Sequence, residues 1–242
     1  MPDTGSAFCP PRSYESAGFA MTPSGPSDAI NLWHAVGLSL WKFVFCVLNR
    51  VDIRNPEGRP LPGERSVMLL YNHTSAIDPF LVAATAMPYF SKVWWRAPAK
   101  EELYRYPVIR SILDSWGAFP VRRGQRDFAS MAKMVQMLRE SVIVIAPEGS
   151  RSRDGKLLRG RPGVGKIIYD AQPAKVIPVA IRGTREILPV GKILPRFGKR
   201  AVILYGPPID LSSCYALADS LETSQKIVDR VMEALARHLE GL

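Results

Sequence analysis

The sequence is poor in the side chains that build disulfide or metal frameworks. Its three cysteines are far apart, no CxxC or CxxH spacing occurs, and there are only three histidines. A disulfide scaffold, a zinc cage and a multi-histidine metal site are therefore not expected, and we predict neither a metal nor a cofactor. Acidic residues are also few, 22 against 32 Lys and Arg. The resulting charge of +10 favours an anionic partner: nucleic acid, a membrane surface or a phosphorylated substrate.

The length and composition are those of an ordinary globular chain. With 242 residues, 47% of them hydrophobic, the chain can form one large domain or one domain with an appendage. Residues 1–27 hold five Pro, five Ser and three Gly, which predicts a mobile tail. No basic region followed at once by an apolar core occurs there, so a cleaved signal peptide is not supported. The scarcity of cysteine favours an intracellular or cytosol-facing protein.

Residues 29–48 form an apolar stretch long enough to span a bilayer. Four polar residues interrupt it: Asn31, His34, Ser39 and Lys42. Its two tryptophans favour the headgroup zone of a membrane. Three interpretations follow, of which we favour the first: an interfacial or re-entrant helix, a soluble helix packed on the domain, or a true span. Asn49-Arg50 ends this stretch, and residues 55–63, which are rich in Pro and Gly, predict a linker.

From Ser66 onward, short apolar runs alternate with helical patterns, which is typical of an α/β domain. The predicted strands are Ser66–Tyr71, Ser141–Ala146, Val176–Ile181 and Ala201–Tyr205. The predicted amphipathic helices are Asp127–Arg139 and Leu217–Leu239. We therefore predict a mostly parallel or mixed central sheet with helices on both faces, preceded by a membrane-associating helical segment. The expected division is a tail at 1–27, a helix and linker at 28–60, and a catalytic domain at 61–242.

The excess positive charge is concentrated in the middle of the chain. Residues 91–200 hold 23 Lys and Arg against 9 Asp and Glu, and the rest of the chain holds 9 against 13. Arginine outnumbers lysine in the two main clusters, at 122–126 and 151–161. Because a guanidinium group offers a planar fork for phosphate oxygens, we favour a phosphate site over a basic face that meets anionic lipid.

The first chemical motif is NHTSAIDP at 72–79, which follows a predicted strand and precedes an apolar run that looks helical. Open α/β sheets place catalytic residues at such points. His73 and Asp78, five residues later, could form a base and its orienting carboxylate. A continuous helix would separate the two side chains by about 140°, so the segment must be a turn. The structural alternative is that Asp78, before Pro79, simply caps the following helix.

The second motif is PEGSRSRDG at 147–155, directly after the predicted strand that ends at Ala146. Glu148 could accept a hydrogen bond from a polyol hydroxyl, Gly149 would let the backbone approach a ligand, and Arg151 could bind phosphate oxygens. A structural Glu–Arg pair is the alternative. Two further segments, 117–124 with its paired arginines and 176–179 with a proline inside a strand, could each be simple structure.

In this order, the four segments resemble the glycerolipid acyltransferase family, specifically the 1-acylglycerol-3-phosphate (lysophosphatidate) acyltransferases, over roughly Ser66 to Pro208. The resemblance implies that His73 is the base and Asp78 its orienter. It implies acceptor or phosphate binding by the other matched residues: Arg122, Arg123, Glu148, Gly149, Ser150, Arg151 and Pro178. The chain departs from the family pattern at three places: Arg122, where an acidic residue is common, Ser150, where Thr is usual, and Gly160-Arg161, where a Phe-Lys pair is common.

The resemblance also implies a reaction and its partners. His73 would take the proton of an acceptor hydroxyl as its oxygen attacks the thioester carbonyl of acyl-CoA or acyl carrier protein. The acceptor would be lysophosphatidate, giving phosphatidate in phospholipid biosynthesis, or another lysophospholipid. We expect a membrane-associated protein on the cytoplasmic face, either monotopic or held by a single N-terminal anchor.

Other functions fit the sequence less well. No GxSxG occurs, which counts against a serine hydrolase of the α/β-hydrolase type. The segment 160–166 nearly fits a phosphate-binding GxxxxGK loop, but Ile167 follows it in place of a hydroxyl residue. A non-enzymatic basic protein of the membrane surface stays an alternative. Nucleic acid is not expected as a partner, because the basic residues are not interleaved with aromatic ones.

Overall fold

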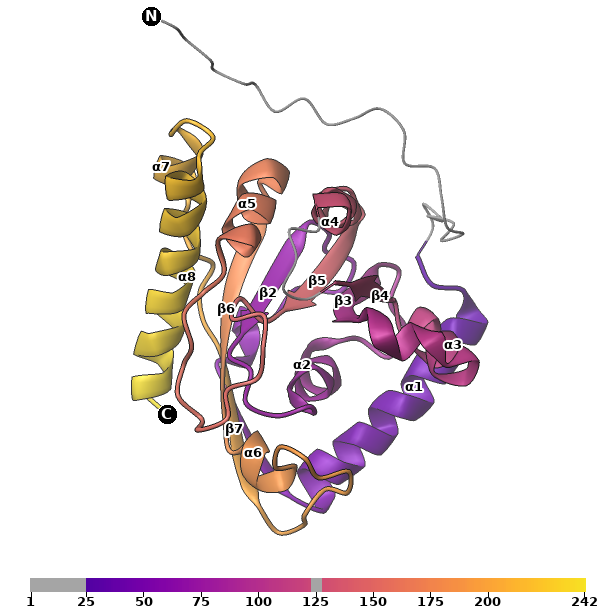
Figure 1. Ribbon diagram of the computed structural model, residues 1–242. Helices are drawn as coiled ribbons and strands as arrows, with labels where there is room; N and C mark the ends of the chain where they lie inside the picture. The colour runs from indigo at the N-terminus through magenta and orange to yellow at the C-terminus, as the bar shows by residue number, and fades with distance from the viewer. Residues whose placement is uncertain (1–24, 123–127) are drawn as a thin grey trace, which may run out of the picture.

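The chain folds around one mixed sheet of seven strands in the order β1-β7-β6-β2-β5-β3-β4. The strands are β1 (Arg50–Arg54), β2 (Val67–Tyr71), β3 (Trp94–Lys100), β4 (Ala118–Val121), β5 (Ser141–Ile145), β6 (Lys175–Arg182) and β7 (Arg200–Tyr205). The computed structural model describes residues 25–122 and 128–242 (Figure 1). The predicted tail therefore lies almost wholly outside the described residues. The strands from β6 to β4 are parallel, whereas β7 is antiparallel to β6 and parallel to β1.

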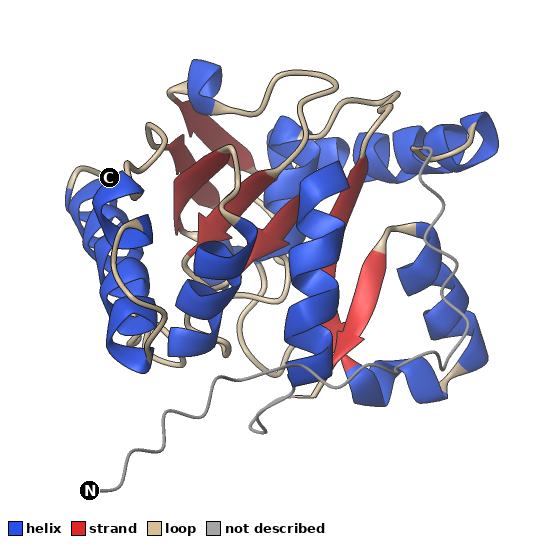
Figure 2. Cartoon of the chain, turned by 90° about the horizontal axis from the view of Figure 1, so that it is seen from above, coloured by secondary structure: helices blue, strands red, loops and turns tan. Residues whose placement is uncertain are grey.

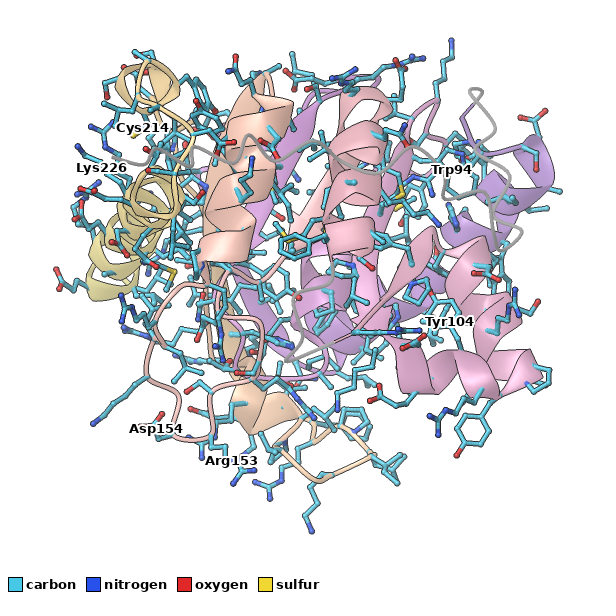
Figure 3. All side chains as sticks on the ribbon, turned by 45° about the horizontal axis from the view of Figure 1, so that its top comes forward. Trp94, Tyr104, Arg153, Asp154, Cys214 and Lys226 are labelled. Atoms are coloured by element: carbon cyan, nitrogen blue, oxygen red, sulfur yellow. The ribbon has the colours of Figure 1, made fainter. Side chains whose placement is uncertain are left out.

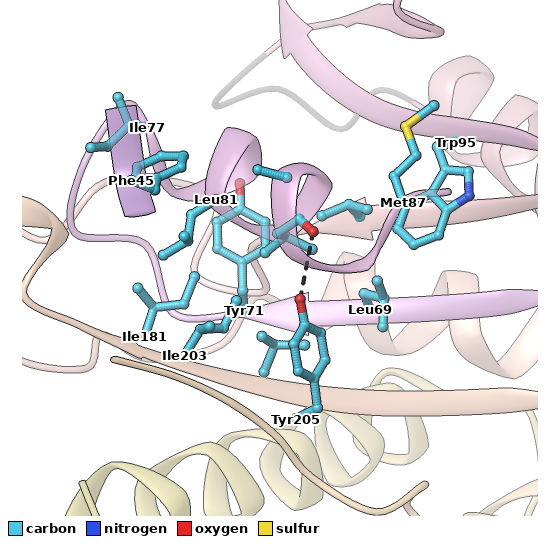
Figure 4. Close-up of a cluster of buried hydrophobic side chains, with 14 of the residues drawn as sticks. Phe45, Leu69, Tyr71, Ile77, Leu81, Met87, Trp95, Ile181, Ile203 and Tyr205 are labelled. Atoms are coloured by element: carbon cyan, nitrogen blue, oxygen red, sulfur yellow. Dashed lines mark hydrogen bonds between the residues drawn. The ribbon is translucent and has the colours of Figure 1, made fainter. Parts of the chain in front are cut away.

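Helices cover both faces of this sheet, as predicted (Figure 2). The helices are α1 (Asp28–Lys42), α2 (Asp78–Ala86), α3 (Pro107–Ser115), α4 (Phe128–Glu140), α5 (Pro162–Ala171), α6 (Thr184–Ile187), α7 (Ser212–Tyr215) and α8 (Leu221–Glu240). A π-helical turn at Phe43–Val47 continues α1, and two 3-10 turns occur at Pro56–Gly58 and Glu101–Arg105. The first core lies between the sheet and helices α1, α2 and α6, and the second lies under α4, α5, α7 and α8. Figure 4 shows part of the first core, where Phe45 of the π-helical turn reaches the cluster that contains Ile77 and Tyr205.

The four predicted strands are all present, but three further strands were not predicted. β1 and β4 are the two edges of the sheet, and β3 lies next to an edge. β1 alternates charged and apolar residues, and β3 and β4 each contain a proline, Pro98 and Pro120. Short, charged and proline-containing strands are typical of sheet edges and carry a weak sequence signal. β1, at residues 50–54, pairs with β7, so the sheet includes a strand that precedes the expected boundary at residue 60.

The two terminal helices bury opposite kinds of residue. α8 buries apolar side chains, among them Ile227, Val231 and Leu235, and it is capped by Ser220, whose hydroxyl accepts the N–H of Thr223. α1 instead buries polar residues beside Leu38. This is the reverse of a helix that borders water, where the apolar stripe faces the core.

The four polar residues that interrupt the apolar stretch fasten α1 to the domain. Asn31 exchanges hydrogen bonds with the backbone of Ser91, and a ring nitrogen of His34 lies 2.7 Å from the carbonyl oxygen of Ser115. The Lys42 ammonium lies 3.9 Å from the centre of the Tyr89 ring. Hydrogen bonds from Lys42 and then Ser39 lower the pKa of the Tyr89 hydroxyl. The helix therefore lies along the domain with its apolar side outward.

The segment that nearly fits a phosphate-binding loop has a packing role. Gly165 lies inside α5, and a Cβ there would overlap the carbonyl oxygen of Ser224 in α8. A Cβ at Gly160 would meet the side chains of Val228 and Met232 at 2.7–2.8 Å. The two glycines thus let α5, and the loop that leads into it, pack closely against α8. The segment does not form a phosphate-binding loop.

Candidate functional site

The predicted catalytic motif occupies the turn between β2 and α2, at the C-terminal ends of the parallel strands. From here on, the edge of the sheet means this border formed by the strand ends, and not the outer strands β1 and β4. Residues 72–77 are neither helix nor strand, and α2 begins at Asp78. The turn is held at its first residue, because the Asn72 side chain exchanges hydrogen bonds with the backbone of Ile181 in β6 at 2.7 and 2.9 Å. The segment is a turn, as the spacing predicted, and this turn brings His73 and Asp78 together.

His73 and Asp78 form a buried pair. The distance from His73 Nδ1 to Asp78 Oδ2 is 2.9 Å, and the two side chains are 11% and 0% exposed. Because a carboxylate only accepts, Nδ1 is the protonated nitrogen of a neutral His73 in this pair, and Nε2 then has a free lone pair. Nε2 makes no hydrogen bond to any residue that the structure describes. The imidazole is therefore fixed by one nitrogen and open at the other, which is the arrangement of a general base.

Asp78 is held by groups of the turn and by one distant residue. Its Oδ2 also accepts the N–H groups of Thr74 and Ser75, both at 2.7 Å. Its Oδ1 accepts the hydroxyl of Thr184 at 2.5 Å, and that hydroxyl lies 3.2 Å from the hydroxyl of Thr74. The carboxylate therefore reaches back over its own turn, and helix α2 has no side-chain cap. Thr184 carries no motif that marks it in the sequence, although its place just after β6 puts it at the same edge of the sheet.

Glu148 is buried beside this pair and binds backbone groups. Its Oε1 accepts the N–H of His73 at 2.7 Å, its Oε2 accepts the N–H of Leu158 at 2.8 Å, and the residue is 1% exposed. Burial raises the pKa of the Glu148 carboxyl, whereas these two N–H groups lower it by a smaller amount. The structure thus gives both carboxylate oxygens partners in the backbone, where the sequence had suggested a ligand hydroxyl.

The loop from Glu148 to Leu158 folds over the catalytic turn. The N–H of Ser152 donates to the carbonyl oxygen of His73 at 2.8 Å, so His73 is bonded to this loop on both sides of its backbone. Gly149 has a φ of +70°, a conformation that side chains disfavour. Figure 3 shows Arg153 and Asp154 on the outer turn of the loop.

The basic residues of this loop and its continuation are exposed: Arg151, Arg153, Lys156, Arg159 and Arg161. Ser150 is half-buried at the start of the loop. None of the five cations forms an ion pair with a residue in the described part of the chain. The loop therefore adds open positive charge to the edge that holds His73.

The other predicted phosphate-binding residues are Arg122 and Arg123, after β4. Arg122 is exposed and pairs with Glu101, with Nε 2.8 Å from a carboxylate oxygen. Arg123 lies outside the described residues. β4 is parallel to β3 and β5, so this segment leaves the sheet at the same edge as the catalytic turn.

Pro178 lies inside the sheet. It is opposite Leu70 of β2, and its carbonyl oxygen accepts the N–H of Gly206 at 2.8 Å. The ladder between β6 and β7 begins one residue later, at Val179 opposite Tyr205. The missing N–H of the proline thus falls where β7 ends, which explains how a central strand tolerates it.

No group of three or more His, Cys, Asp or Glu side chains that could hold a metal ion occurs within residues 25–122 and 128–242. The site combines a buried histidine–carboxylate pair, a second buried carboxylate and exposed arginines.

Comparisons with known proteins relate the chain to a family. A family model described as acyltransferase matches residues 50–182, from β1 to the end of β6. A 1-acyl-sn-glycerol-3-phosphate acyltransferase of Bacillus subtilis is 28% identical over 168 residues, covering 69% of this chain and 77% of that protein. A protein of the same name from Borreliella burgdorferi is 27% identical over 180 residues, covering 73% and 66%.

A solved structure shares the fold. The crystal structure of the 1-acyl-sn-glycerophosphate (LPA) acyltransferase PlsC from Thermotoga maritima superposes with a TM-score of 0.66 at 21% identity. The match covers 86% of this chain and 79% of that one. The similarity in architecture therefore extends beyond residues 50–182.

Proposed function

The chain belongs to the acyltransferase family, and we propose that it transfers a fatty acyl group from acyl-CoA or acyl carrier protein to the free hydroxyl of lysophosphatidate, giving phosphatidate. The observation that carries the chemistry is the buried His73–Asp78 pair with Nε2 open. The acceptor is suggested by the relatives, which are named for this activity, and by the arginines at the same edge.

In the proposed mechanism, His73 Nε2 accepts the proton of the acceptor hydroxyl while that oxygen attacks the thioester carbonyl. The carbon–sulfur bond then breaks, the acyl group stays on the acceptor oxygen, and the thiolate leaves with the proton returned from His73. Asp78 holds the imidazole in the tautomer with Nδ1 protonated and stabilises the imidazolium that forms. A thiol is a good leaving group, so this scheme needs neither a strong acid nor a metal.

Two further residues keep this pair in place in the same scheme. The Thr184 hydroxyl fixes the second oxygen of Asp78, which orients Oδ2 toward the histidine. Glu148 fixes the backbone N–H of His73. We assign both to positioning, because each touches Asp78 or His73 and neither offers a free group to the substrate.

We assign the acceptor phosphate to the arginines at this edge. Arg151 follows Gly149, where the backbone turns with positive φ, and its guanidinium is exposed and without an ion pair among the described residues. Arg123, and Arg122 once released from Glu101, would add to the same site. A bound phosphate would place the neighbouring hydroxyl near His73 and convert binding into orientation.

We also propose that the protein acts on the cytoplasmic face of a membrane. The helical segment Asp28–Val47 is long and apolar enough to cross a bilayer, with a mean hydropathy of 1.4 over its best window. Its polar residues are bonded to the domain, however, so a helix that lies along the membrane surface with the domain attached explains the structure best.

The decisive experiment is acyl transfer by the purified protein from radiolabelled acyl-CoA, and separately from acyl carrier protein, to lysophosphatidate. Wild-type protein should form phosphatidate, and His73→Ala should lose activity by about 10²–10⁴-fold while circular dichroism and vesicle binding stay unchanged. A folded His73→Ala variant that transfers at the wild-type rate would exclude His73 as the base. Transfer to other lysophospholipids but not to lysophosphatidate would reassign the acceptor.

A further inference from the structure

The outward side of α1 is an apolar surface that the domain does not cover. Val36, Leu40 and Val47 are 58%, 60% and 67% exposed, and Leu32 and Phe43 lie exposed on the same stretch. Since the polar residues of this helix are the ones bonded to the domain, the helix is built for an apolar medium on its outer side.

A second apolar element lies at the C-terminal end of this helix. We call residues 188–198, between α6 and β7, the docking loop. Its Ile193 and Leu194 are 91% and 80% exposed, the highest values among the exposed large apolar side chains of the described residues, and Phe197 is 59% exposed. Lys192 precedes the pair Ile193-Leu194, and Arg196 directly precedes Phe197. No acidic residue occurs from Ile187 to Pro208.

The docking loop is joined to both α1 and the catalytic turn. Its last residue, Gly198, donates its N–H to the carbonyl oxygen of Leu48 at 2.8 Å, just after the π-helical turn. Its first residue, Leu188, accepts the hydroxyl of Ser75 at 2.7 Å. Figure 1 shows α1 running from α3 to the segment that follows α6. One side of the molecule thus connects the apolar helix, the docking loop and the turn that carries His73.

We propose that the docking loop inserts Ile193 and Leu194 into an anionic membrane beside α1, with Lys192 and Arg196 among the lipid headgroups. The pattern of exposed apolar residues between cations matches an interfacial membrane segment, since apolar burial and attraction to anionic lipid act together there. This contact holds the edge of the sheet with His73 against the headgroup layer, where a lysophospholipid acceptor would be presented. The proposal deepens the function proposed above and rests on it for that acceptor.

Charge argues for a membrane over a second copy of this chain. A symmetric contact centred on the docking loop would bring that loop of one copy against the same loop of the other, and its Lys192 and Arg196 against the same cations. The loop has no acidic residue to pair with them. An anionic bilayer supplies both the apolar interior and the opposite charge.

The test compares Ile193→Asp/Leu194→Asp with the matched variant Leu221→Asp. Leu221 is 73% exposed at the start of α8, on the other face of the sheet. Sedimentation with vesicles of phosphatidylcholine, with and without phosphatidylglycerol, measures binding. We expect the double variant to bind anionic vesicles roughly tenfold or more weakly, because two large apolar side chains no longer leave water. Leu221→Asp should bind like wild type.

Transfer assays then separate docking from chemistry. The double variant should lose activity on lysophosphatidate embedded in vesicles by a similar factor, yet keep wild-type activity on a short-chain, monomeric lysophosphatidate. Equal vesicle binding by the double variant and Leu221→Asp would overturn the proposal. So would a wild-type dimer that the double substitution dissociates without any change in vesicle binding. Absence of transfer by wild type to either acceptor would refute the function, while the binding result would still stand on its own.

Discussion

The two halves of the candidate site differ in how completely their polar groups are paired. In the half around the catalytic turn, every carboxylate oxygen of Asp78 and Glu148 accepts a hydrogen bond from the fold itself. In the half built by residues 151–161, the cations are exposed and form no ion pair within the described residues. The first half is organised before any substrate arrives, which suits a base that must be aimed. The second half is completed only by an anionic ligand, which suits recognition.

Asp78→Asn should have the largest effect on activity, because Asp78 accepts hydrogen bonds from His73, from the backbone of the turn and from Thr184. The imidazolium would lose its counter-charge, and a neutral amide oxygen would hold the Nδ1 proton less strongly than the carboxylate does. We expect kcat to fall by about 10²–10⁴-fold in the transfer assay. Asp229→Asn, at an exposed carboxylate of α8, is the control and should leave kcat unchanged. Full activity in a folded Asp78→Asn protein would show that the pairing is only structural.

Thr184 tests whether the paired half extends beyond the motif. Thr184→Val keeps the shape and removes the hydroxyl that bonds to Asp78, so kcat should fall by about tenfold with little change in KM. Thr184→Ser restores the hydroxyl and should restore most of the activity. If Val and Ser variants had equal kcat values, the hydroxyl would have no positioning role.

The role of Glu148 in the paired half can be tested through the free energy of unfolding. In Glu148→Gln, one amide N–H group must face a backbone N–H, so we expect the free energy of unfolding to fall by about 1–3 kcal/mol. Burial raises the pKa of Glu148 in the folded protein. Its contribution to stability is therefore fully present below the ordinary carboxyl pKa and is lost as the pH rises through the raised value. Denaturant titrations over that range should show this slope in wild type and a smaller slope in Glu148→Gln; identical slopes would contradict the assignment.

Replacing Arg151 should have the smallest effect, limited to substrate binding by the exposed cations of residues 151–161. Arg151→Ala should raise KM for lysophosphatidate several-fold, roughly 3–10-fold, and leave kcat nearly unchanged, because an exposed cation contributes less than a buried one. Arg237→Ala, an exposed arginine of α8 on the far face, is the matched control. A fall in kcat with constant KM would place Arg151 in the paired half instead.

The parts of the fold that could be predicted share a local signal. β2, β5, β6 and β7 are apolar runs bounded by turn residues, and the motif at 72–79 required a turn because a helix would separate its two side chains. The edge strands β1 and β4 lacked such a signal, since they are short and hold charged residues or proline. The sequence predicts helix α1 as an apolar segment, but it does not predict which side of the helix faces the domain.

What the sequence determined by itself was the turn that could bring His73 and Asp78 together, the place of the basic residues along the chain and the apolar helix near its start. Only the tertiary structure decided that Thr184 bonds to Asp78 across 106 residues, that Glu148 holds the backbone of His73 across 75, and that the docking loop meets the end of α1. The reason is the order of the strands. β6, β2 and β5 are neighbours in the sheet but distant in the chain, and a local pattern carries no record of which strand ends will meet.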